Sequence, residues 1–120
     1  MVGIQIPQEL VEETYKAVEL ARTSGKIAKG SNETTKQVER GQAKLVVVAK
    51  DVEPKEVVMH LPLLCKDKGV VCVEVPSKEE LGAAAGLGVK TACVSIVKEG
   101  DARDSVSRII EQVRSLEKSS

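Results

Sequence analysis

The sequence predicts an α/β fold, a three-layer α-β-α sandwich around a small mixed sheet of about four strands. Two observations support this prediction. Helical and extended hydrophobic patterns alternate along the chain, and the extended stretches are short and apolar enough to lie between layers of helices. A length of 120 residues suits one compact core, so residues 1–120 are expected to form a single domain.

Helices are expected where apolar residues recur at intervals of three and four, and strands where short runs are rich in β-branched residues. In chain order, the expected elements are a helix at 7–24, a strand at 26–29, a helix at about 32–41, a strand at 45–49, a helical turn from Pro54, a helix at 61–68, a strand at 70–75, a helix at 78–85, a strand at 92–97, and a closing helix with an apolar stripe from Val106 to Leu116.

Polar residues mark the starts of two of these helices. Ser31 or Asn32 is expected to cap the second helix, and Ser77 with Glu80 forms a capping box at the start of the fourth. The run 45–49 contains no polar residue, which predicts a central strand covered on both faces.

The composition argues against several classes of protein. Apolar residues make up 42% of the chain, which argues against disorder. No apolar run approaches the roughly 20 residues that a membrane helix needs, and we expect no secretory leader, because Met1 to Pro7 is short and carries no basic side chain. Tyr15 is the only aromatic residue, which argues against a platform that stacks single-stranded RNA on several rings.

The cysteines and the histidine give little indication of a disulfide framework, a metal site or a catalytic site. Cys65, Cys72 and Cys93 are odd in number and lack C-x-x-C spacing, so neither a disulfide framework nor a zinc ribbon fits. They are expected to be buried thiols of a cytoplasmic protein. His60, the only histidine, lies in an apolar segment and is expected to be structural. The sequence therefore predicts no enzyme, no metal and no cofactor.

The formal net charge of zero conceals a basic stretch. Residues 22–50 carry seven basic and two acidic side chains, and the neighbouring segments are acidic. Such a stretch can present a basic patch to phosphate groups. It can equally be a solvated face whose charges the acidic segments neutralise, and the charge pattern alone leaves both interpretations open.

The most informative motif begins at the start of the second expected helix. Asn32, Lys36 and Arg40 are spaced four residues apart, and Glu33 lies three residues before Lys36, so all four can share one exposed helical face. Gly30 lacks a Cβ and lets another backbone come close.

Glu33 is unexpected in a basic segment, because phosphate would repel its carboxylate. An ionised carboxylate only accepts hydrogen bonds, so a nucleic-acid partner must be a donor such as guanine N1–H or N2. Pairing with cytosine occupies N1–H, so the guanine must lie in a distorted pair. Asn32 could then bridge neighbouring bases, and Lys36 could meet guanine O6 or N7. Phosphate contacts would fall to Lys26, Lys29 and Arg40.

The same residues also fit an ordinary helix start. Ser31 or Asn32 would be the cap, Glu33 a first-turn partner of the helix dipole, and Glu33 with Lys36 a surface ion pair. The residues by themselves leave this alternative open.

Three motifs resemble a known family. Residues 29–41 read K-G-S-N-E-T-T-K-Q-V-E-R-G, residues 60–65 read H-L-P-L-L-C, and residues 77–86 read S-K-E-E-L-G-A-A-A-G. Together they resemble the kink-turn RNA-binding family of L-seven-Ae type, found in the archaeal large ribosomal subunit. The resemblance runs through essentially the whole chain.

This resemblance implies an α-β-α sandwich that grips sharply bent RNA at tandem sheared G·A pairs, in which the guanine N1–H is free. By motif position, Asn32, Glu33 and Lys36 would read the bases, and Gly30 would permit close approach. Phosphate contacts would come from Lys29, Arg40 and Lys78.

The loop Leu87-Gly88-Val89-Lys90-Thr91 resembles the segment of this family that covers unstacked nucleotides of the RNA bulge. Gly88 and Lys90 depart from its usual acidic residue and proline, so the loop is expected to be more mobile and more basic. An ordinary helix-to-strand connector is the alternative. A dinucleotide-binding glycine fingerprint at Gly82, Gly86 and Gly88 is rejected, because these glycines close a helix instead of opening one.

The expected function is non-catalytic binding that stabilises kink-turn RNA. The resemblance implies several hosts, namely large-subunit rRNA, box C/D and box H/ACA guide RNAs, and RNase P RNA. The implied protein partners are a Nop-domain scaffold with fibrillarin and the pseudouridine synthase complex. The free protein is expected to be monomeric. The alternatives are a small hydrolase or transferase, for which the sequence offers no nucleophile–base pair or phosphate loop, and a ribosomal or translation-factor module of the same fold with a different RNA target.

Overall fold

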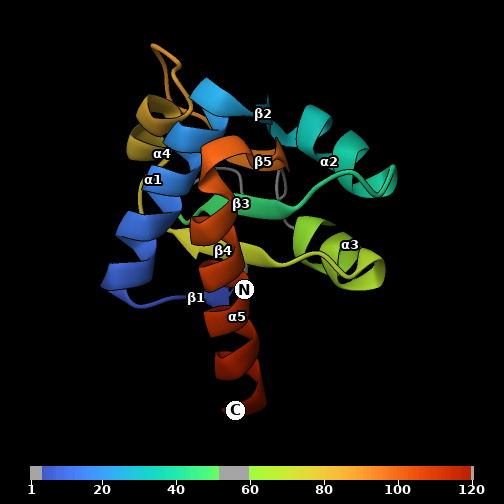
Figure 1. Cartoon of the computed structure of the whole chain (residues 1–120). Coiled ribbons are helices and arrows are strands. Elements are labelled where there is room, and N and C mark those ends of the chain that lie inside the picture. Colours follow the sequence, from blue (N-terminus) through green and yellow to red (C-terminus); the bar gives the residue numbers. More distant parts are fainter. Residues whose placement is uncertain (1–3, 52–59, 120) are drawn as a thin grey trace.

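The computed structural model of the chain describes residues 4–51 and 60–119 (Figure 1). The described elements are β1 (Ile4–Gln5), α1 (Gln8–Ser24), β2 (Lys26–Lys29), α2 (Ser31–Glu39), β3 (Leu45–Ala49), α3 (His60–Lys68), β4 (Cys72–Val75), α4 (Lys78–Ala84), β5 (Cys93–Lys98), the 3-10 helix η2 (Gly100–Ala102) and α5 (Arg103–Ser119).

The predicted α/β sandwich is confirmed, with one addition to the sheet. All four expected strands form, and a fifth, β1, pairs in parallel with β4 at the edge of the sheet. β1 contains only two residues, which is too short to produce an alternating pattern in a sequence. The helical turn expected at Pro54 lies outside the described residues.

The sheet is mixed, in the order β1-β4-β3-β5-β2. β3 pairs in parallel with β4 and antiparallel with β5, and β2 pairs antiparallel with β5. All five residues of β3 are buried, as predicted for a central strand. Because β2 pairs with β5, the start of α2 lies beside the start of β5.

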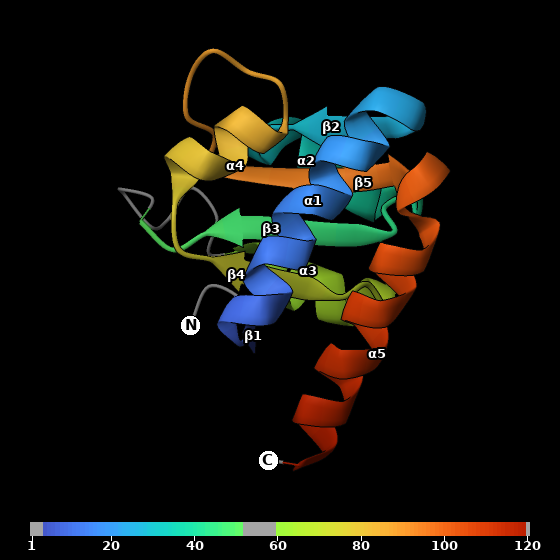
Figure 2. The ribbon, with the colours of Figure 1, turned by 60° about the vertical axis from the view of Figure 1, so that its left-hand side comes forward.

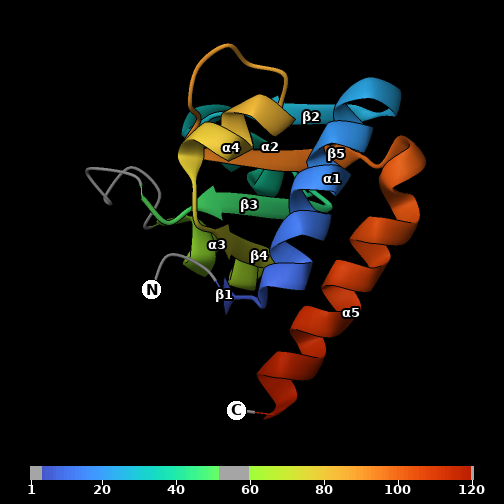
Figure 3. The same cartoon turned by 90° about the vertical axis from the view of Figure 1, so that its left-hand side faces the viewer.

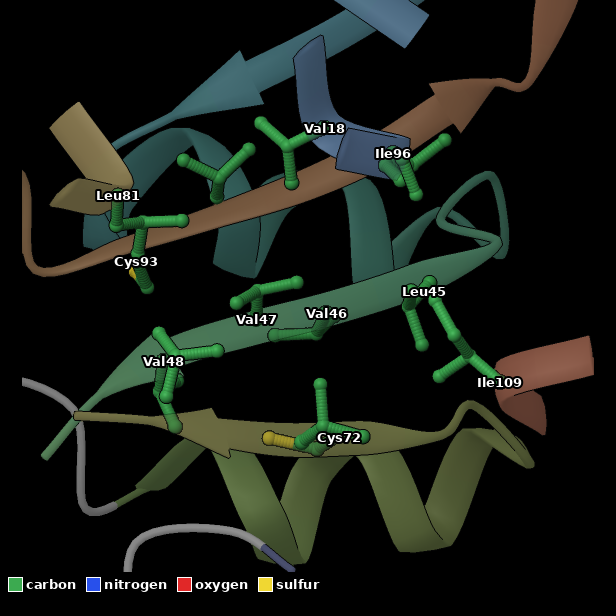
Figure 4. Close-up of a cluster of buried hydrophobic side chains, with 14 of the residues drawn as sticks. Val18, Leu45, Val46, Val47, Val48, Cys72, Leu81, Cys93, Ile96 and Ile109 are labelled. Atoms are coloured by element: carbon green, nitrogen blue, oxygen red, sulfur yellow. The ribbon is translucent and has the colours of Figure 1, made fainter. Parts of the chain in front are cut away.

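The helices form two layers around this sheet. Figures 2 and 3 show α1 and α4 in front of the strands, α5 beside α1 at the right, and α2 and α3 behind the strands. The side chains of β3 pack toward both layers of helices, because successive residues point to opposite faces of a strand. In Figure 4, Leu45 points toward Ile109 of α5, on the side of the sheet that faces α1 and α5. Buried residues from both layers and the sheet form one hydrophobic cluster.

The start of α4 is held by side chains. The Ser77 hydroxyl oxygen accepts a hydrogen bond from Glu80 N at 3.2 Å, which confirms Ser77 as the cap but only one half of the predicted capping box, because Ser77 N donates to the Tyr15 hydroxyl. Asp51 Oδ1 accepts from Lys78 N at 2.8 Å. The Tyr15 hydroxyl joins the same turn to α1, since it accepts from Ser77 N at 3.3 Å. Burial raises the pKa of Tyr15 above its ordinary value.

We expect Ser77→Ala to lower the free energy of unfolding by about 1 kcal/mol, because the Glu80 N–H loses its partner at the helix start. Urea denaturation measures the change. Ser107→Ala is the matched control, because Ser107 is exposed within α5 and caps no helix. An equal loss in both variants would contradict the capping role of Ser77.

Within the described ranges, none of the helices combines the length and the hydrophobicity needed to cross a lipid bilayer.

Candidate nucleic-acid interface

Gly30 forms the junction between β2 and α2. It is the N-cap of α2 at φ 89° and ψ 162°, a conformation that is essentially restricted to glycine. Thr34 N donates to the Gly30 carbonyl oxygen at 3.0 Å. The prediction that Ser31 or Asn32 caps this helix is therefore wrong. Both residues lie inside the first turn, because the positive φ of Gly30 turns the chain one residue earlier.

The two sides of α2 differ in chemistry. Thr34, Gln37 and Val38 are buried, whereas Asn32, Glu33 and Lys36 are exposed. The amphipathic spacing produces this division, since positions three and four apart share a helical face. The predicted exposed face is thus present, and its polar groups are not required by the core.

Glu33 and Lys36 form an ion pair on this face, with Lys36 Nζ 3.3 Å from Glu33 Oε1. The side chains are 54% and 55% exposed, respectively. Exposed pairs of this kind contribute about 0–1 kcal/mol. The interpretation of these residues as an ordinary helix start predicts this ion pair. Breaking the pair requires little free energy, so a ligand can replace either partner.

His60 supports the first turn of α2 from the neighbouring helix. Thr35 Oγ1 donates to the Ser31 carbonyl oxygen at 2.7 Å and lies 2.7 Å from His60 Nε2. Because the hydroxyl hydrogen is used on Ser31, Nε2 of the histidine is the donor to Thr35. His60 is exposed at the start of α3. Its contact with Thr35 agrees with the structural role predicted for it.

A chain of hydrogen bonds joins α2 to the loop between α4 and β5. The Cys93 carbonyl oxygen accepts from Gly30 N at 2.9 Å and from Thr91 Oγ1 at 3.2 Å. Thr91 N donates to the Lys78 carbonyl oxygen at 3.2 Å. The start of α2, the start of α4 and the α4–β5 loop, which are far apart in the sequence, therefore meet at one point. Each of the three contains residues that are predicted to contact RNA.

The loop itself is exposed and partly apolar. The Val89 side chain is 70% exposed, and Gly88 and Lys90 are exposed on either side of it. Leu87 is half-buried and packs against the core. The loop protrudes from the body of the molecule between α4 and β5 (Figure 3). It thus presents one apolar side chain and one cation beside the start of α2.

Two predicted phosphate-binding residues lie farther from this meeting point. Lys26 is at the opposite end of β2 from Gly30, beside Lys98 of β5. Arg40 follows the last turn of α2, ~12 Å along the helix axis from Asn32. Both are exposed. Lys26 and Arg40 therefore extend the candidate surface in two directions, away from the point where α2, α4 and the α4–β5 loop meet.

Cys65, Cys72 and Cys93 are all buried, as predicted, and none of the three forms a disulfide. Burial raises the pKa of Cys93 to about 11. A hydrogen bond with Cys65, together with burial, raises the pKa of Cys72. The same hydrogen bond lowers the pKa of Cys65. A raised pKa keeps the thiols of Cys72 and Cys93 protonated, and protonated thiols are poor nucleophiles and poor metal ligands. Within residues 4–51 and 60–119, no group of three His, Cys, Asp or Glu residues is placed to hold a metal ion.

The predicted site gave no role to two residues of the meeting point, Thr91 and Gly82. Thr91 contributes through its hydroxyl and its backbone N–H, and no local pattern signals such a role. Gly82 lies inside α4, where the loop backbone passes directly over it. An isolated glycine within a helical pattern costs stability and often has a packing reason, so this signal was available in the sequence.

Comparison with known proteins agrees with the fold. Residues 12–106 match the model of the ribosomal protein L7Ae/L30e/S12e/Gadd45 family. Among solved structures, a 15.5kD RNA binding protein of Giardia lamblia superposes with a TM-score of 0.88 and is 40% identical in sequence. The match covers 92% of each of the two chains.

Proposed function

The chain belongs to the ribosomal protein L7Ae/L30e/S12e/Gadd45 family, and we propose that it binds and stabilises kink-turn RNA through the surface formed by α2 and the α4–β5 loop. The RNA-binding relative from Giardia lamblia supports RNA as the ligand. In this proposal the protein is non-catalytic. It needs only to bind the bent form of the RNA much more tightly than the extended form.

One observation carries the proposal, which is the position of the Glu33 carboxylate. It is half-exposed on a face that also presents Asn32 and Lys36, with Lys29 and Arg40 exposed nearby on the same segment. A carboxylate in such a place suits a donor and not a phosphate. The free Watson–Crick edge of a sheared guanine is such a donor, and the surrounding cations suit the backbone of the same RNA.

The environment of Gly30 also supports this proposal. A Cβ built on Gly30 would have no heavy atom within 4 Å, so the backbone is open to a ligand on that side. A sugar or phosphate could approach there while Asn32 and Glu33 reach the bases. Val89 and Leu87 could cover the unstacked nucleotides from the adjacent loop.

The test is a comparison of two RNA hairpins by gel shift or calorimetry at fixed salt. One contains an intact kink-turn, and its twin has both G·A pairs replaced by Watson–Crick pairs. We expect the intact RNA to bind at least ~10-fold more tightly, since each lost base contact costs about 1–3 kcal/mol. Equal affinities would contradict kink-turn recognition and favour a module of the same fold with another RNA target.

Lys78 is proposed to contact phosphate from the first turn of α4. We expect Lys78→Ala to weaken binding to both hairpins alike and to reduce the slope of log affinity against log salt by roughly one unit. Lys16→Ala on α1 is the control, since Lys16 is exposed and lies outside the proposed surface. A slope that is unchanged in Lys78→Ala would remove this residue from the phosphate contacts.

We further propose the complexes in which this binding takes place. The candidates are the archaeal large ribosomal subunit, box C/D and box H/ACA guide ribonucleoproteins, and RNase P, all in the cytoplasm. A Nop-domain scaffold with fibrillarin, or the pseudouridine synthase complex, would dock after a monomer of this protein has bent the RNA. Sequencing of RNA that copurifies with the protein from cells tests these hosts, and an absence of all three RNA classes would contradict them.

A further inference from the structure

Gly82 occupies an unfavourable place for a glycine, because it lies inside α4. The surrounding structure explains why a larger residue does not fit. A Cβ at this position would meet the Val89 carbonyl oxygen more closely than real Cβ atoms approach any heavy atom, and it would lie 3.0 Å from Lys90 Cα. Both neighbours are backbone atoms of the α4–β5 loop, so neither can move aside by a side-chain rotation.

The loop is also tied to α4 on both sides of this contact. Leu87 N donates to the Gly82 carbonyl oxygen at 2.9 Å, and Thr91 N donates to the Lys78 carbonyl oxygen at 3.2 Å. Between these two hydrogen bonds, backbone atoms of Val89 and Lys90 lie close to Gly82. The Val89 carbonyl faces α4, and the Val89 side chain is left 70% exposed.

We propose that Gly82 is a positioning residue of the RNA-binding surface. Its missing side chain lets the backbone of Val89 and Lys90 lie against α4, and this contact directs the Val89 side chain and Lys90 toward the RNA bulge. The inference rests on the proposed function, because it takes the α4–β5 loop to cover the RNA bulge. Gly82 sets the shape of this loop without touching RNA.

The variant Gly82→Ala separates the effect of loop shape on RNA affinity from the effect of helix stability. Alanine is the residue that best favours a helix, so α4 itself gains from the change. The methyl group must nevertheless displace Val89 and Lys90, since their backbone atoms occupy its place. A loss of RNA affinity in Gly82→Ala would therefore come from the loop and not from a weakened helix.

The experiment uses the intact kink-turn hairpin and a copy in which the unstacked bulge nucleotides are abasic. We expect the wild-type protein to bind the abasic copy about 5- to 100-fold more weakly, the range for a covered base. Gly82→Ala should lose a similar factor on the intact hairpin and almost nothing further on the abasic copy. The control is Ala83→Gly, which weakens the helix at an exposed position and should keep the wild-type affinity for both RNAs.

Two results would overturn the proposal. One is wild-type affinity of Gly82→Ala for the intact hairpin, and the other is an equal loss on both RNAs. If Gly82→Ala does not fold, Thr91→Val carries the test, because it removes the Thr91 hydroxyl bond to Cys93 at the other end of the loop. It should lose affinity only for the intact hairpin, and equal losses would again contradict the proposal. Failure of kink-turn recognition itself would appear separately, as equal wild-type binding to the G·A-disrupted twin.

Discussion

Glu33→Ala is expected to weaken binding to an intact kink-turn by about 1–3 kcal/mol, the range for a specific base contact. The two oxygens of this carboxylate can accept hydrogen bonds from guanine N1–H and N2 at once. The loss should nearly vanish on the hairpin whose G·A pairs are replaced, because those guanines no longer offer a free edge. Calorimetric titration of both RNAs measures the two losses.

Stability should change little in this variant. The Glu33–Lys36 pair is about half exposed, and exposed ion pairs contribute little to folding. Glu39→Ala removes another exposed carboxylate from the same helix and is the matched control. Glu39 lies outside the proposed contacts, so this variant should bind as the wild type does. An identical loss for Glu33→Ala on both hairpins would show that the carboxylate does not read bases.

Gly30→Ala is expected to lower the free energy of unfolding by about 1–3 kcal/mol. The reason is conformational, since an alanine Cβ has open space but the residue must adopt φ 89° and ψ 162°. Relaxation of this strain would shift the first turn of α2 and would weaken its hydrogen bond to Cys93. RNA affinity should therefore fall as well. Urea denaturation and RNA titration of the same preparation give both quantities.

Gly88→Ala is the control for this variant. Gly88 also has open space around a built Cβ, but its φ is not positive. Its alanine variant should therefore keep its stability within about 0.5 kcal/mol, as most surface substitutions do. If Gly30→Ala is equally stable, the special backbone of Gly30 does not contribute to folding.

Most of the fold could be predicted because its signals are local. The β-branched run of β3, the apolar stripes of the helices and the Ser77 cap each occupy a few consecutive residues. The start of α2 was misplaced by one or two residues, because a glycine cap leaves no side-chain signal to compete with Ser31 and Asn32. The two-residue β1 was missed, since its pairing with β4 depends on a partner far along the chain.

The candidate site was predicted in its chemistry but not in its assembly. Helical spacing was sufficient to place Asn32, Glu33 and Lys36 on one exposed face. It gave no indication that the Cys93 carbonyl holds Gly30 and Thr91 together. Gly82 was considered only as part of a rejected glycine fingerprint, although its place inside a helix already called for a packing explanation.

The amino-acid sequence alone determined which groups this protein presents, because periodicity and side-chain chemistry act over a single turn of helix or a few residues of strand. The tertiary structure decided which of them lie together. Antiparallel pairing of β2 with β5 brings Gly30 to Cys93 across more than half of the chain, and the backbone contact at Gly82 shapes the loop beside them. Such neighbours arise from long-range pairing and close packing, which leave little trace in the order of residues.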